Sequence, residues 1–125
     1  MNVPKELFYT KEHVWVKKLD NDSVLVGLTD KAQNDLNSMV FVNLPFVGDS
    51  FAADDVLCDV ESVKSVSDVY APVSGTVAKV NEILMDTPEL INQDPYGAWI
   101  AELAGVSGME NLLSADDYAA QCEDE

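Results

Sequence analysis

The sequence predicts a small, mainly β protein: a barrel or sandwich with helices added at its periphery. Short runs rich in β-branched and aromatic residues recur at regular spacing, and clusters of Asn, Asp, Ser, Gly and Pro separate them. The chain has 125 residues and is 47% hydrophobic, which suits one globular domain with a core and is too short for two ordinary domains. We therefore expect a single domain over residues 1–125.

The expected elements follow from local patterns. The predicted strands lie at residues 12–16, 24–28, 40–44, 56–60, 75–82 and 98–103. Thr29 can cap a short helix over residues 31–36, and Ser114 can cap a C-terminal helix over residues 116–122. A further helix is expected to start at Thr87, because Pro88 would then occupy its first position.

The segment 59–75 is the part of the chain with the most distinctive pattern. It reads as two short valine-rich strands that meet at a turn, with a single lysine, Lys64, near the tip. A hairpin would present this side chain as a long, flexible amine on a rigid base. Most exposed lysines only aid solubility, so the local pattern alone leaves the role of Lys64 open.

The charge of the chain narrows its partners. Asp and Glu number 23 against seven cations, all of them lysines, which gives a net charge of −16. Nucleic acid is a poor partner for such a chain, because its binding rests on Lys and Arg. The acidity favours partners with electropositive surfaces, and selection for solubility or for a salty habitat explains it equally well.

The two cysteines, Cys58 and Cys122, lie far apart and without a cluster of His or Cys. They indicate neither a zinc site nor a disulfide framework, and a reducing compartment fits best. The first residues contain no apolar leader segment, and no stretch is long enough to span a membrane. We expect a bacterial cytoplasmic protein without a metal site.

Catalytic motifs are missing from the sequence. His13, the only histidine, stands beside a strand pattern and is more simply a hydrogen-bonded structural imidazole than a general base. No nucleophile with a recognisable base, phosphate loop or metal-ligand spacing accompanies it. The large aromatic residues Trp15, Trp99, Phe41 and Phe46 are expected in the core. An enzyme with its own active site is therefore not expected.

Several separated motifs resemble, in the same order, the glycine cleavage system H-protein family. Residues 60–75 closely resemble its lipoyl-attachment motif, with Lys64 at the attachment position. The other matches lie at residues 9–15, 27–33, 40–45, 80–82, 88–99 and 112–118. Val63 and Ser65 flank the lysine where biotin carriers typically have methionines, which favours lipoate.

The resemblance implies a lipoyl-like flattened β-barrel or sandwich (a barrel-sandwich hybrid) with short peripheral helices and a C-terminal helix. It implies lipoate in amide linkage on Lys64. The implied role is a non-catalytic shuttle that carries an aminomethyl group from the P-protein glycine decarboxylase to the T-protein aminomethyltransferase. The L-protein dihydrolipoyl dehydrogenase would reoxidise the arm, and a lipoate-attaching enzyme would load it. We expect a monomer.

Four further residues are candidates for contact with the arm or with docked partners. Glu61 and Asp68 flank the lysine, and Glu12 and His13 are candidates near a possible cleft for the arm.

The chain also departs from the family pattern. It has Val14 where the family commonly has Glu, Asn37 and Ser38 where Gly and an acid are usual, and Asp54 where a turn glycine is common. The run 97–99 looks one residue short. Two other interpretations stay open: a lipoyl relay or donor that serves other enzymes, and a plain structural domain in which Lys64 is never modified.

Overall fold

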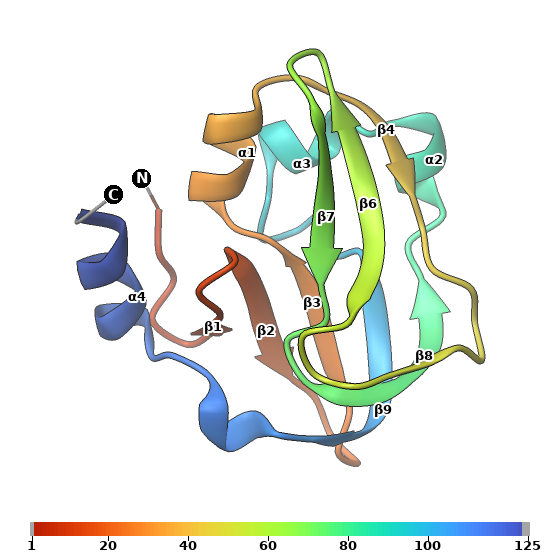
Figure 1. The fold of residues 1–125 in the computed structure, drawn as a ribbon, viewed down its shortest axis with the longest axis vertical. Helices are drawn as coiled ribbons and strands as arrows, with labels where there is room; N and C mark the ends of the chain where they lie inside the picture. Colours follow the sequence, from red (N-terminus) through yellow and green to blue (C-terminus); the bar gives the residue numbers. More distant parts are fainter. Residues whose placement is uncertain (1, 124–125) are drawn as a thin grey trace.

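The computed structural model describes residues 2–123, and they form a mainly β protein as predicted. Its strands make two antiparallel sheets with the orders β1-β2-β3-β9-β8-β5 and β4-β6-β7 (Figure 1). The strands are β1 (Phe8–Tyr9), β2 (Val14–Lys18), β3 (Val24–Leu28), β4 (Met39–Asn43), β5 (Ser50–Phe51), β6 (Val56–Ser62), β7 (Val66–Tyr70), β8 (Ser74–Val80) and β9 (Ala101–Ser107).

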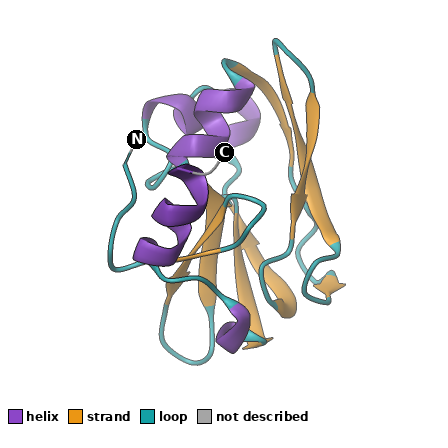
Figure 2. Ribbon diagram, turned by 60° about the vertical axis from the view of Figure 1, so that its left-hand side comes forward, coloured by secondary structure: helices purple, strands orange, loops and turns teal. Residues whose placement is uncertain are grey.

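Short helices lie at the periphery of the sheets. They are α1 (Asp30–Leu36), α2 (Ile83–Asp86), α3 (Leu90–Gln93) and α4 (Ala115–Glu123), with a 3-10 turn at Met109–Asn111. Figure 2 shows the hairpin of β6 and β7 standing apart from most of the helices. Over residues 2–123, no helix is long and apolar enough to cross a bilayer.

The core lies between the two sheets. Val16, Val26 and Leu103 of the larger sheet form one buried cluster with Val60 and Val69 of the smaller sheet. Burial of such a side chain stabilises the fold by about 1.5–3 kcal/mol. The sheets thus pack as the flattened sandwich that the sequence and the family resemblance predicted.

The side-chain caps predicted at Thr29 and Ser114 are confirmed, and the one predicted at Thr87 is not. The Thr29 hydroxyl accepts a hydrogen bond from the N–H of Ala32 at 3.2 Å and so starts α1. The Ser114 hydroxyl accepts one from the N–H of Asp117 at 3.2 Å at the start of α4. Short polar side chains at these positions satisfy amide groups that have no partner within the helix.

Two predictions for the second half of the chain have the right element but the wrong start. The helix expected after Thr87 is present as α3, but it begins at Leu90 and has no side-chain cap, and the N–H of Thr87 ends α2 by donating to the carbonyl of Ile83 at 2.8 Å. The last strand begins at Ala101 instead of residue 98, because the N–H of Ala98 donates to the carbonyl of Asp94 and continues the turn after α3.

The aromatic residues predicted for the core divide into two groups. Trp15 is buried and Trp99 is half-buried, whereas Phe41 and Phe46 are exposed. A shift of register between Met39 and Phe41 interrupts the alternation of β4 and leaves Phe41 outside. Phe46 lies beyond β4, in the loop that leads to β5. The prediction was therefore wrong for both phenylalanines.

Candidate functional site

Lys64 lies in the three-residue connection between β6 and β7, at the tip of their hairpin (Figure 1). Its side chain is exposed, and Val63 beside it is 68% exposed. The strands below are paired from Val56↔Tyr70 up to Glu61↔Val66. A paired base with an exposed connection holds the lysine away from the core while fixing where its backbone lies.

Ser62 organises the turn. Its hydroxyl accepts hydrogen bonds from the N–H groups of Lys64 (3.2 Å) and Ser65 (3.1 Å). It also donates to the carbonyl of Ser65 at 3.1 Å, and the Ser62 N–H donates to the same carbonyl at 2.8 Å. Serine suits this task because its short side chain can bond to the backbone two or three residues ahead.

The segment between α1 and β4 braces the tip from one side. The N–H of Val63 donates to the carbonyl of Ser38 at 2.9 Å. The Lys64 ammonium donates to the carbonyl of Asp35 at 3.2 Å, in the last turn of α1. Carbonyl groups at a helix C-terminus attract a cation, so this end of α1 suits the lysine in its unmodified form.

Asn92 in α3 holds the bracing segment in place. Its side-chain carbonyl accepts from the N–H of Met39 at 2.8 Å. Its amide donates to the carbonyl of Asn37 at 2.8 Å and to the side chain of Gln33 at 3.1 Å. Asn92 thus connects α3 through the 37–39 segment to the hairpin tip. The sequence showed Asn92 only as part of a motif, because these contacts join residues far apart in the chain.

Acidic residues lie along the base of the hairpin. Asp59 and Asp68 are directly opposite each other, and Glu61 pairs with Val66 next to the turn. Like charges placed opposite each other repel, and Asn43 offsets part of this by donating to the carboxylate of Asp59. Glu61 is three residues before Lys64 and Asp68 is four residues after it, so both predicted docking residues lie on the hairpin that carries the lysine and give it negative charge.

His13 and Glu12 have different surroundings. His13 precedes β2 instead of lying in a strand, and its Nδ1 shares a hydrogen bond of 2.7 Å with the Tyr118 hydroxyl of α4. Glu12 is exposed and lines a hollow of about 260 Å³ together with Asp54, Pro72 and their neighbours. Val14 is fully buried, so the chain has a core residue at the position where the family commonly has an acid.

The Cys58 thiol is not suited to nucleophilic chemistry. Burial raises the pKa of the Cys58 thiol to about 12, with the neighbouring Asp59 carboxylate adding to the effect. A thiol with such a pKa stays protonated at neutral pH and is a poor nucleophile. Across residues 2–123, no group of three or more His, Cys, Asp or Glu is arranged to hold a metal ion.

A small sandwich that presents one exposed amine on a braced hairpin has the design of a carrier for a covalently attached group. The sequence model of the family described as glycine cleavage H-protein matches residues 7–125. The chain therefore belongs to the glycine cleavage H-protein family.

Individual relatives agree with this assignment. A glycine cleavage system H protein of Coprothermobacter proteolyticus is 54% identical over 121 residues, covering 94% of this chain and 95% of the relative. A probable glycine cleavage system H protein of Pyrococcus horikoshii is 52% identical over 120 residues, covering 94% and 90%. The crystal structure of a glycine cleavage system H protein from Mycobacterium marinum superposes with a TM-score of 0.88 at 38% identity, covering 96% and 98%.

Proposed function

We propose that the chain is the lipoyl-bearing shuttle of the glycine cleavage system. In this role it carries an aminomethyl group from the P-protein glycine decarboxylase to the T-protein aminomethyltransferase, and the L-protein dihydrolipoyl dehydrogenase reoxidises its arm. The observation that carries the proposal is Lys64, exposed at the tip of a braced hairpin in a chain of this family. The names of the relatives do not favour the alternative of a lipoyl relay or donor.

The surroundings of Lys64 fit a lipoyl amide. Acylation removes the charge of the amine but leaves one N–H, which can still donate to the carbonyl of Asp35. The turn bonds made by Ser62 use backbone groups and do not involve the lysine amine. The site can therefore accept the modification without loss of its scaffold.

In this geometry the attached cofactor supplies the chemistry and the chain positions it. When attached, the lipoyl group supplies a disulfide that opens to a thiol pair, so redox and group transfer belong to the cofactor. The chain supplies placement: the lysine stem extends an arm with on the order of ten rotatable bonds well over 10 Å from the backbone. Tethering gives the arm a high effective concentration at a docked enzyme. The chain needs no active site of its own.

The acidic hairpin base is a docking surface in this proposal. Glu61 and Asp68 would attract electropositive surfaces of the lipoate-attaching enzyme and of the glycine cleavage enzymes. Glu12 and His13 are retained as candidate arm contacts. Charge reversal at Glu61 and Asp68 should slow lipoylation and transfer at low salt, and unchanged rates at low salt would reject this part of the proposal.

The setting we propose is a single carrier domain over residues 1–125 that works as a cytoplasmic monomer. A bacterial source remains a prediction, because similar proteins occur in both bacteria and archaea.

Intact mass measurement after co-expression with a lipoate-attaching enzyme tests the attachment. We expect a gain of one lipoyl group in the wild-type chain and none in Lys64→Arg. Because Lys64 is exposed, the variant should fold normally, which circular dichroism and thermal unfolding can verify. Absence of a gain in the wild-type chain would reject both carrier functions and leave a structural domain.

A further inference from the structure

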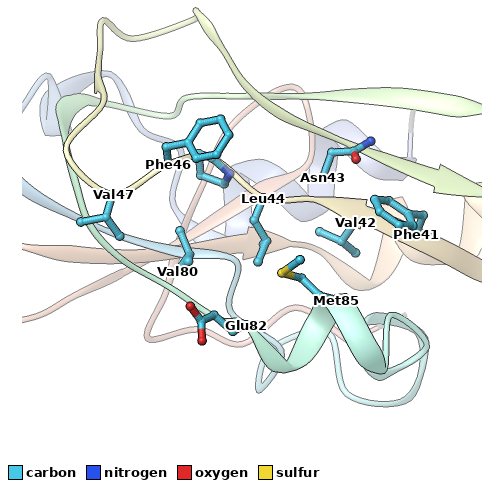
Figure 3. Close-up of a pocket in the computed structure, with 10 residues that line it drawn as sticks. Phe41, Val42, Asn43, Leu44, Phe46, Val47, Val80, Glu82 and Met85 are labelled. Atoms are coloured by element: carbon cyan, nitrogen blue, oxygen red, sulfur yellow. The ribbon is translucent and has the colours of Figure 1, made fainter.

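An apolar groove lies beside the hairpin, between β4 with its following loop on one side and α2 on the other (Figure 3). It has a volume of about 520 Å³ and is lined mainly by apolar side chains. The apolar lining includes Phe41, Leu44, Phe46, Val47, Val80 and Met85. Leu44 and Met85 point toward one another across it in Figure 3. Phe46 is 77% exposed and Met85 57%, so the largest apolar side chains here face solvent.

Backbone bonds hold the loop that presents Phe46. The N–H of Asp49 donates to the Phe46 carbonyl at 3.1 Å, and the N–H of Gly48 donates to the Val77 carbonyl at 2.8 Å. The N–H of Val77 in turn donates to the Asp49 carbonyl at 2.8 Å. The loop is therefore anchored on β8, which fixes the backbone position from which the Phe46 ring extends into solvent. Aromatic and methionine side chains presented in this way are typical of surfaces that bind another protein.

Carboxylates flank the groove. Glu82 lines it directly, and the register of β4 with β6 places Glu61 opposite Phe41 and Asp59 opposite Asn43. A second copy of this chain, with its net charge of −16, would bring acid against acid. The charge therefore selects a partner that has an apolar projection surrounded by Lys or Arg.

The pairing of β4 with β6 also sets the distance from the groove to Lys64. Met39 pairs with Ser62 and Phe41 with Glu61, so the groove begins three residues before Lys64 along β6. Three residues span at most about 10 Å even when fully extended, which is within the reach of the lysine arm. A protein seated in the groove would thus have the tip of the hairpin at its edge.

We propose that this groove docks an apolar projection, rimmed by Lys or Arg, on an enzyme that receives the Lys64 arm. The inference rests on the proposed function, because it takes the occupant to be P-protein or T-protein, the enzymes that load and unload the arm. The groove supplies the contact energy and the acidic rim supplies orientation. The arm then reaches the active site without a tight contact of its own.

The test compares lipoylated variants as substrates for P-protein and T-protein. Replacing both Phe46 and Met85 with serine should raise the KM for the carrier about tenfold or more with at least one enzyme, while kcat changes less than twofold. Val40→Ser is the matched control, since Val40 is 53% exposed on the same strand but does not line the groove. It should keep the KM of the wild-type chain.

A second variant tests the rim without touching the apolar contact. Glu82→Lys should raise the KM several-fold at low salt, and the increase should shrink at high salt. Equal KM values for the wild-type chain, the double variant and Val40→Ser with both enzymes would overturn the proposal. A wild-type dimer in sedimentation that the double variant abolishes would also overturn it, because the occupant would then be a second copy.

If the wild-type chain is not lipoylated, or does not support transfer, the proposed function fails. If the wild-type chain is active and the groove variants match it, only the docking proposal fails.

Discussion

The Lys64 hairpin and the cluster of Tyr118, Thr29 and His13 beneath α4 are both held by hydrogen bonds from polar side chains. These bonds lie at the surface in the hairpin and in the interior beneath α4. At the hairpin, the hydroxyl of Ser62 binds exposed backbone groups, and the tip stays in solvent. Beneath α4, the Tyr118 hydroxyl is 2.7 Å from both the Thr29 hydroxyl and His13 Nδ1. Burial raises the pKa of the Tyr118 phenol well above its usual range, so this hydroxyl stays neutral.

The two regions therefore contribute differently: the residues beneath α4 stabilise the fold, and the hairpin presents the functional lysine. A buried hydrogen bond stabilises because loss of one partner leaves a polar group without water. An exposed one contributes less to stability but can fix the direction of a functional side chain. Substitutions beneath α4 and in the core should therefore lower the free energy of unfolding. Substitutions of the residues that brace the hairpin should slow lipoylation of Lys64.

Gly27→Ala should have the largest effect. Gly27 pairs with Trp15, and a Cβ there would lie 2.6 Å from the indole ring. Because the ring is buried, we expect the free energy of unfolding to fall by about 3 kcal/mol, measured by chemical denaturation. The cost should fall by at least half in a Trp15→Leu background, and an equal cost in both backgrounds would contradict the clash.

Tyr118→Phe should cost about 2 kcal/mol of unfolding free energy, because it removes a buried partner of Thr29 and His13. Lipoylation of the folded protein should be unchanged. Tyr70→Phe is the control, since Tyr70 is only half-buried on β7. A slower lipoylation rate in Tyr118→Phe at a temperature where it is fully folded would show that the two regions are coupled.

Asn92→Ala should change the rate of lipoylation more than it changes stability. Loss of its contacts to Met39 and Asn37 should cost only about 1–2 kcal/mol, since the side chain is half-buried. The 37–39 segment should loosen, so amide exchange at Val63 should speed up and lipoylation should slow several-fold. Gln93→Ala, an exposed neighbour in the same helix, is the control. Unaltered exchange at Val63 would argue against the brace.

Asn37→Gly should have the smallest effect, and it should be stabilising. Asn37 has φ 67° and ψ −155°, a conformation that glycine adopts far more readily than other residues. We expect a gain of about 1 kcal/mol in unfolding free energy. Asn34→Gly, inside α1, should instead lose about 0.3 kcal/mol, the difference between the helix propensities of Asn and Gly. A loss in both variants would mean that the Asn37 side chain is needed.

Local features of the sequence predicted much of the fold. The caps at Thr29 and Ser114 depend on neighbouring residues, which the sequence displays directly. The exposure of Phe41 depends on a shift of register against β6, and this is decided by strand pairing instead of by local composition.

The candidate site was predictable in part. The position of Lys64 between two strand patterns could be read from the sequence, but its importance came from the resemblance of several motifs together. The brace through Asn92 could not be predicted, because it joins α3 to Gln33, Asn37 and Met39. These residues lie between 53 and 59 positions earlier in the chain. The apolar groove could not be predicted for the same reason, since β4 and α2 meet only in the folded chain.

Glycine-dependent carbon dioxide exchange by P-protein, measured with the lipoylated chain, tests the central claim most directly. The wild-type carrier should support saturable exchange, and Lys64→Arg at the same concentration should give only the rate seen without a carrier. Lys64→Arg that supports exchange at the wild-type rate would contradict the account, as would a lipoylated wild-type chain that supports none.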